Sequence, residues 1–270
     1  MKQIYKTIHM FLLIAAALFS TTSCSEEEAT RFNSERGVNF LIYDTQSNSY
    51  QDDYTNLKTT INFYNYYLKG WDINEVSLKL GVSIEGTLSD QPVHVRLKTQ
   101  PVEDYSTAII EVPGDSIINP GEYRRTITVN CKRPNSYDTE ERTNVTFDYS
   151  ACGLVPGTKE RQLYTVTLTD ATDWSAMSVD NETKWNESYA ATLGKYGPVK
   201  VRFIMVVLGT KYNYTAQALN NLYYYTVAYP NYGFKKELDH LKEALREYNK
   251  SHDTPLTEPD GTLVSFEPAN

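Results

Sequence analysis

The residues Glu75-Val76-Ser77-Leu78-Lys79-Leu80-Gly81-Val82-Ser83-Ile84 decide the fold of the first half of the chain. Apolar side chains occupy every second position of this stretch, and polar residues or glycine fill the positions between them. A period of two is typical of a β-strand that is buried on one face and exposed on the other. The stretch therefore predicts a half-buried strand of an antiparallel sheet.

The same pattern returns in shorter runs on both sides of this strand. Alternation predicts further strands at 38–43, 59–66, 93–97 and 125–131. Turn sequences with glycine or proline separate the runs, and no window shows the 3.6-residue period of a helix. Several short strands punctuated by turns are typical of a β-sandwich. We therefore expect an antiparallel, immunoglobulin-like β-sandwich domain over 37–152.

The pattern changes after this region. Glycine and proline at 153–157 indicate a domain boundary, and alternation over 162–169 predicts a strand. The segment 198–208 alternates and then becomes continuously apolar, which favours a central strand. A short strand is expected at 262–266.

One helix stands out in the second half. Apolar residues at 234–248 follow a 4-3-4-3 spacing, which places them in one stripe on a helix. The segment 215–227 fits a second helix or a strand. We therefore expect a smaller α+β domain over 153–270, in a chain that is mainly β.

The chain begins with an apolar run that stops shortly before a cysteine. Lys2 and Lys6 precede the apolar segment 10–19, and Cys24 follows it after small and hydroxyl residues. The run fits a signal peptide and is shorter than the roughly 20 residues of a membrane-spanning helix. We expect a lipoprotein signal peptide at 1–23 and attachment of acyl chains such as palmitate to Cys24. The alternative is an ordinary secretory peptide with an incidental cysteine.

Acidic residues dominate the segment after this cysteine. The sequence Ser-Glu-Glu-Glu at 25–28 resembles the signal that sends lipoproteins of Bacteroidota to the outer face of the outer membrane. The segment 24–36 has too little apolar bulk to fold alone, so we expect a flexible acidic tether. Each buried methylene of an acyl chain contributes about 0.8 kcal/mol to anchoring. We therefore expect a lipid-anchored protein of the cell outer membrane that faces outward. The alternative is that the Ser-Glu-Glu-Glu segment is only a solvated linker and carries no sorting signal.

The overall charge argues against one class of partner. The chain has 26 basic and 34 acidic residues, a net charge of −8, and it has no basic block. Nucleic-acid binding depends on neutralising phosphates with lysine and arginine. We therefore expect no nucleic-acid partner.

Two cysteines remain downstream of the anchor. In an exported protein, Cys131 and Cys152 could form a disulfide worth roughly 3 kcal/mol in the chain-entropy model. Two separate buried thiols are the alternative, and the sequence does not decide between them.

The sequence carries no recognisable catalytic centre. It lacks a Gly-x-Ser-x-Gly motif, a glycine-rich phosphate loop and a His-Glu-x-x-His motif. Glu237, His240 and Glu243 have the spacing of a helical metal site, but a solvated helix face explains them better. We expect no cofactor, no metal and no enzymatic activity. A surface glycoside hydrolase or peptidase is the less favoured alternative, because paired carboxylates can come from distant strands.

Aromatic residues are the remaining candidates for binding. Twenty-two tyrosines exceed ordinary usage, and all three tryptophans lie in polar surroundings. Exposed rings stack on sugars or pack against peptides and proteins. The candidate ligand or partner contacts are Trp71, Trp174, Trp185, Tyr66 and Tyr67. Packing is an equal alternative for Trp71 and the favoured one for the other two tryptophans, at the junction between domains.

Several segments carry family resemblances. Asp104-Tyr105, 109–113 and 120–123 resemble the latter half of Calx-β-like sandwich domains, without their calcium-binding carboxylate clusters. The leader and tether, the first strand at 38–41, the segment 104–125 and the segment 193–204 together resemble a family of Bacteroidota lipoproteins known only as a domain of unknown function.

The second resemblance implies a setting for the protein. Such lipoproteins are often encoded beside SusC/SusD-type outer-membrane importers, in which a lipoprotein covers a TonB-dependent barrel. It implies an accessory subunit of such a nutrient importer, which binds a glycan or peptide or docks on the complex. The alternative is a purely structural interaction subunit without ligand binding.

Overall fold

The computed structural model describes residues 36–51, 56–69, 71, 73–137, 139–174, 181–212 and 234–268. The predicted signal peptide, the lipid attachment at Cys24 and the tether up to residue 35 lie outside these residues. So does the predicted helix or strand at 215–227.

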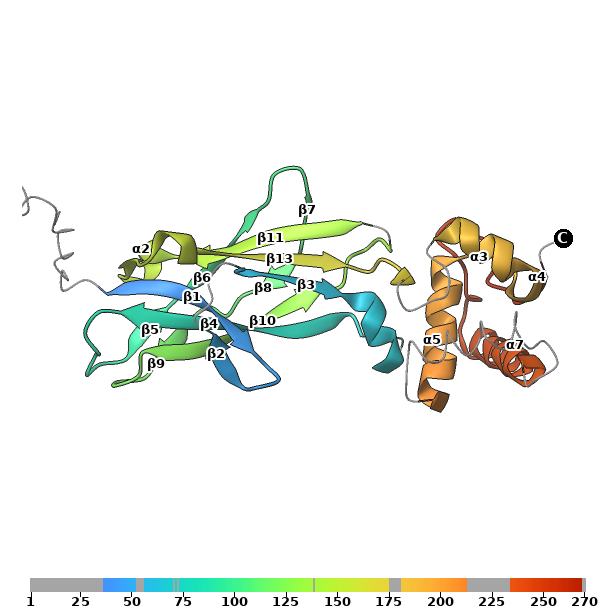
Figure 1. The fold of residues 1–270 in the computed structure, drawn as a ribbon, viewed down its shortest axis with the longest axis horizontal. Helices are drawn as coiled ribbons and strands as arrows, with labels where there is room; N and C mark the ends of the chain where they lie inside the picture. Colours follow the sequence, from blue (N-terminus) through green and yellow to red (C-terminus); the bar gives the residue numbers. More distant parts are fainter. Residues whose placement is uncertain are drawn as a thin grey trace, which may run out of the picture.

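Two sheets face each other across one apolar core, as expected for a β-sandwich (Figure 1). The first sheet consists of β1 (Gly37–Asp44), β2 (Ser49–Gln51), β4 (Glu75–Glu85), β8 (Ile110–Glu111), β10 (Arg124–Lys132) and β12 (Val155–Pro156). The second consists of β3 (Lys58–Asn62), β6 (Leu97–Pro101), β7 (Ser106–Thr107), β11 (Glu140–Phe147) and β13 (Leu163–Thr169). β5 (Val93–Val95) and β9 (Ser116–Ile118) form a separate ribbon. The predicted fold class, a mainly β chain with an antiparallel sandwich, is confirmed.

The opening stretch forms β4, which pairs antiparallel with β1 on one side and with β10 on the other. Val76 and Leu80 are buried, whereas Ser77 and Lys79 between them are exposed, as the alternation predicts. Gly81 falls on the face of β4 that the alternation predicts to be exposed, yet it is buried, because Tyr50 of β2 covers it. A Cβ at this position would lie 2.8 Å from the Leu41 carbonyl oxygen and 3.1 Å from the Tyr50 ring. Only glycine fits there without a shift of the backbone.

The sandwich extends beyond the expected boundary at Cys152. β13 lies between β3 and β11, pairing parallel with β3 and antiparallel with β11. The strand predicted at 162–169 therefore exists, but it belongs to the sandwich and not to a C-terminal domain. The glycine- and proline-rich segment 153–157 is a connection inside the sandwich, and it contains β12.

Short helical turns and a small helical unit complete the fold. Within the sandwich and at its end lie η1 (Phe63–Lys69), α2 (Tyr149–Cys152) and η2 (Lys159–Arg161). The helical unit consists of α3 (Glu182–Ser188), α4 (Ala190–Leu193), α5 (Pro198–Tyr212) and α7 (Phe234–Ser251). α7 confirms the predicted helix, with Leu241 and Leu245 buried in its apolar stripe.

The central strand predicted at 198–208 is wrong, because these residues form α5. Side chains from Val199 to Met205 are all buried, so the helix is covered on every side and lacks the polar face that reveals a helical period. The strand predicted at 59–66 ends earlier, at Asn62, and η1 follows it. The Asn62 side chain accepts a hydrogen bond from the backbone amide of Tyr64 at 3.0 Å, which favours the turn into η1. At 262–266 the described chain has one isolated bridge, between Thr257 and Leu263.

The two ends of the sandwich have different neighbours (Figure 1). β1 begins at one end, and the helical unit lies at the other, with α5 crossing beside η1. β1 therefore begins at the end of the sandwich far from the helical unit (Figure 1).

Candidate functional site at the junction of the sandwich and the helical unit

The ends of two sandwich strands and the short helix η1 lie beside α5. Asp170 directly follows β13, and Arg133 directly follows β10. Tyr64 and Tyr67 come from η1, which packs against α5. Both tyrosines belong to the apolar core of the helical unit, so η1 connects the two units.

A buried carboxylate holds the junction together. Asp170 Oδ2 accepts from Arg133 Nε at 2.8 Å and from the Tyr67 hydroxyl at 3.1 Å. Asp170 Oδ1 accepts from Arg202 Nη2 at 3.1 Å and from Arg202 Nε at 3.2 Å. The Asp170 and Arg202 side chains are 1% and 0% exposed. The pair thus joins the end of a sandwich strand to α5 in a region without solvent.

All three nitrogens of the Arg202 guanidinium donate hydrogen bonds. Its Nη1 donates to the Pro198 carbonyl at 2.7 Å and to the Thr172 hydroxyl at 3.3 Å, and its Nη2 also donates to the Asp170 carbonyl. A buried ion pair is stable only when its remaining hydrogen-bonding capacity is satisfied in this way. The structure therefore meets the condition for keeping both charges.

Aromatic rings enclose the two arginines. The Arg202 guanidinium lies 4.4 Å from the centre of the Tyr137 ring and 5.2 Å from that of Tyr64. Arg133 lies 4.9 Å from the centre of the Tyr67 ring. Burial raises the pKa of the Tyr64 and Tyr67 hydroxyls above the ordinary value, so both stay neutral. Tyrosine rings shield the charges from water.

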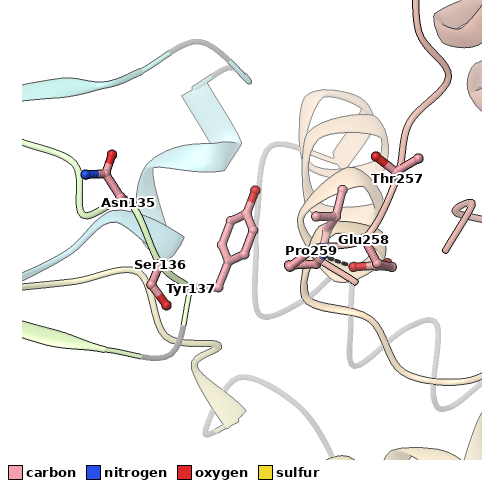
Figure 2. A pocket seen from close by; sticks show the side chains of 7 residues that line it. Asn135, Ser136, Tyr137, Thr257, Glu258 and Pro259 are labelled. Carbon is pink, nitrogen blue, oxygen red and sulfur yellow. Dashed lines mark hydrogen bonds between the residues drawn. The ribbon is translucent and has the colours of Figure 1, made fainter. Parts of the chain in front are cut away.

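A pocket of about 440 Å³ is lined in part by Tyr137, whose ring contacts Arg202 of this network. Figure 2 shows the pocket. Its lining comes from both units: Asn135, Ser136, Tyr137, Val199, Thr257, Glu258 and Pro259. Tyr137 projects from the sandwich side toward Glu258 and Pro259, which stand on the side of α5 (Figure 2). The pocket therefore depends on how the two units sit together.

Glu258 fixes the wall on the side of α5. Its two carboxylate oxygens accept the backbone amides of Val199 at 2.8 Å and Lys200 at 2.9 Å, at the first turn of the helix. Gly197 makes room, since a Cβ there would lie 2.0 Å from Glu258 Oε1. Burial raises the pKa of Glu258, although these amides act in the opposite direction. Burial lowers the pKa of Lys200, whose ammonium donates to the Leu193 and Lys195 carbonyls.

The predicted aromatic contacts lie mostly in packing. Trp185 is 1% exposed and donates from Nε1 to the Gly194 carbonyl at 3.2 Å, and Tyr67 is 3% exposed. Neither ring is accessible to a ligand, which corrects their assignment as contact residues. Trp185 packs in the apolar core of the helical unit, to which Tyr64 and Tyr67 of η1 also belong.

The other three predicted aromatics are partly exposed. Trp71 lies at the junction, where its ring centre is 5.5 Å from Tyr67 and 6.2 Å from Tyr248 of α7. Trp174 packs against the ring of Tyr196 at 5.0 Å. Tyr66 rests on the sandwich core. Trp71 therefore has the packing role that was the equal alternative to binding.

The two downstream cysteines are free thiols, so the disulfide alternative is not formed. Cys131 is buried in the sandwich core on β10, and burial raises the pKa of its thiol to about 12. Cys152 ends α2 and is partly buried.

Sequence reasoning missed the residues that build this site: Asp170, Arg133, Arg202, Tyr137 and Glu258. One signal was present, since Lys200 and Arg202 interrupt the apolar segment 198–208. A charge inside such a segment indicates a buried partner.

Two features are absent from the described residues. No group of three or more histidine, cysteine, aspartate or glutamate side chains in that part of the chain is placed to hold a metal ion. No helix there is both long and apolar enough to span a membrane.

Comparisons with known proteins show likeness to solved structures alone. No family model matches the chain, and no curated protein matches it. The apo form of the Calx CBD1 domain matches with a TM-score of 0.30 and 11% identity, over 52% of this chain and 99% of that domain. A protein of unknown function from Bacteroides ovatus matches with a TM-score of 0.31 and 10% identity, over 50% of this chain and 46% of that protein.

A second protein of unknown function from the same organism matches with a TM-score of 0.30 and 7% identity, over 48% of this chain and 43% of that protein. The match thus spans less than half the length of either Bacteroides ovatus protein. At these scores the comparisons say nothing about activity.

Proposed function

We propose that this protein is an outward-facing lipoprotein of the outer membrane that serves as an accessory subunit of a SusC/SusD-type nutrient importer. In this proposal the sandwich is a spacer, and the helical unit is a head that captures a glycan or peptide or docks on the complex. A purely docking role without a ligand is the second outcome that the experiments below distinguish.

One observation carries the proposal. β1 begins at the end of the sandwich opposite the helical unit (Figure 1). An anchor at Cys24, joined to β1 through the acidic segment, would therefore hold the head and the junction pocket on the side away from the membrane. Such an orientation suits a protein that meets a ligand or partner outside the cell.

The junction pocket favours binding over hydrolysis. Hydrolysis of a glycosidic bond generally requires two carboxyl groups on opposite sides of the bond. On the described lining the carboxylate is Glu258, and both of its oxygens already accept backbone amides. A residue engaged in this way is suited to shaping a wall and not to transferring protons.

The test of anchoring compares the full chain with Cys24→Ala in intact cells. We expect the full chain to fractionate with the outer membrane and to be cut by protease added outside the cells, and Cys24→Ala to leave the membrane fraction. Retention of Cys24→Ala in the membrane, or protection of the full chain from the protease, would refute the anchored, outward-facing arrangement.

The test of the partner is purification from detergent-solubilised membranes. We expect the importer's barrel and its lid lipoprotein to co-purify with the full chain. A protein that runs alone would remove the accessory role. Co-purification without binding of any glycan or peptide would leave the docking role. Trp71→Ala is unsuitable for this test, because Trp71 packs inside the junction.

A further inference from the structure

We propose that the pocket between the sandwich and the helical unit binds a neutral mono- or disaccharide. The inference rests on the proposed function for its setting, capture of a nutrient outside the cell. The pocket chemistry on which it depends is independent of that setting.

The size and position of the pocket suit a small ligand. Its volume of about 440 Å³ lies within the range of about 300–1,000 Å³ that is typical of small-molecule sites. Such sites occur preferentially where two structural units meet. Here the segment 135–137 belongs to the sandwich, whereas Val199 and the segment 257–259 belong to the helical unit.

The charges around the pocket are already compensated. Asp170 is paired with Arg133 and Arg202 behind the Tyr137 ring. Glu258, the charged side chain on the described lining, accepts two backbone amides of α5. A ligand with a net charge would gain no ion pair from these groups and would lose its hydration. A neutral ligand is therefore favoured over an anion or a cation.

The lining offers both hydrogen bonds and apolar contact. The side chains of Asn135 and Thr257 are exposed at the rim, and an amide and a hydroxyl can each donate and accept. Tyr137 and Pro259 add apolar surface (Figure 2), as does Val199. Sugar rings combine apolar C–H faces with a rim of hydroxyl groups, and they match such a mixed lining.

The same lining is less suited to a peptide. Extended peptides bind by adding a strand to a sheet edge, and helical peptides bind in apolar grooves. The lining segment 135–137 is not a strand, and Thr257 already forms a bridge with Leu263. A peptide would thus find neither mode here, and the geometry favours the sugar.

The experiment measures sugar binding by the full chain purified in detergent. Saturation-transfer NMR against a panel of neutral mono- and disaccharides identifies binders, and titration calorimetry gives their affinities. We expect Asn135→Ala and Thr257→Val each to weaken binding by about two- to tenfold, the loss that follows from one neutral hydrogen bond. Thr99→Val, an identical change at an exposed site on β6, should leave the affinity unchanged.

Three results would overturn the inference. They are silence of the whole neutral panel, binding that survives both pocket substitutions, and a preference for charged sugars or short peptides. Matching circular dichroism spectra and unfolding midpoints would show that the variants are folded. Neutral-sugar binding by a protein that proves not to be surface-exposed would refute the proposed function alone. Surface exposure without neutral-sugar binding would refute this inference alone.

Discussion

The sandwich core and the junction beside it are held together by different interactions. In the sandwich, apolar side chains of two sheets meet, as where the rings of Phe40 and Phe147 stack with centres 4.2 Å apart. At the junction, Asp170 and Arg202 are buried as a charged pair. Apolar burial is the sum of many contacts, so the loss of a few lowers the free energy of unfolding only in part. Removing one partner of a buried ion pair costs more, because it leaves the other charge buried and uncompensated. A single substitution should therefore lower the free energy of unfolding more at the junction pair than in the sandwich core.

Removing the arginine from the junction should have the largest effect. Arg202→Met leaves Asp170 buried with fewer partners, and we expect the free energy of unfolding to fall by about 3–5 kcal/mol. Urea denaturation followed by circular dichroism measures this loss. Arg96→Met is the matched control, because Arg96 pairs with Asp115 on the surface and should cost at most about 1 kcal/mol. Similar losses for both variants would erase the distinction between the junction and an ordinary surface pair.

Truncation of the sandwich core should come next. Leu168 of β13 is fully buried, so Leu168→Ala should lower the free energy of unfolding by about 3 kcal/mol through lost burial and a cavity. The same denaturation experiment applies. A loss below about 1 kcal/mol would mean that β13 is not a central part of the sandwich core.

Aromatic packing across the junction should matter less. Trp71 is partly exposed but contacts Tyr67 and Tyr248, so Trp71→Ala should cost about 2 kcal/mol. The midpoint of thermal unfolding reports this change. Leu88→Ala, at a position that is 55% exposed, should stay within about 0.5 kcal/mol of the parent. If Trp71→Ala is as mild as that control, Trp71 is free for the contact role that the sequence also allowed.

Titration of Glu258 should give the smallest effect. Its pKa in the folded protein lies above the ordinary value of 4.5, so the folded state holds this proton more tightly than the unfolded state does. The contribution of Glu258 to stability is therefore greatest below pH 4.5 and declines as the pH rises through the raised pKa. Glu258→Gln should remove this decline from a series of urea denaturations between pH 4 and 7. An unchanged slope would contradict the raised pKa.

The sequence predicts the sandwich because its strands are covered on one face. β10 and the first half of β4 alternate between more and less buried residues, and this alternation is visible in the sequence without any knowledge of their partners. α5 could not be predicted in the same way, since its residues 199–205 are all buried and show no helical period. The end of the sandwich was misplaced because β13 follows a segment that resembles a linker but contains β12.

The junction was hidden for a different reason. Asp170 and Arg202 are 32 positions apart in the chain, and Arg133 lies 37 positions before Asp170. The sandwich brings the ends of β10 and β13 together, and the packing of α5 across this end adds Arg202. The polar neighbours of the tryptophans in the sequence suggested exposed rings that could contact a ligand. Trp185 of α3 is instead buried. Charged residues inside an apolar segment were the better indication of this site.

A double-mutant cycle tests most directly whether the Asp170–Arg202 pair joins the two units. The free energies of unfolding of the parent, Asp170→Asn, Arg202→Met and the double variant give the coupling energy between the two side chains. We predict a coupling of at least about 1.5 kcal/mol, because Asp170→Asn leaves Arg202 buried without its counter-charge and Arg202→Met leaves Asp170 paired with Arg133 alone. Losses that add to within about 0.5 kcal/mol would show that the two residues act independently, and would contradict a junction held by this pair.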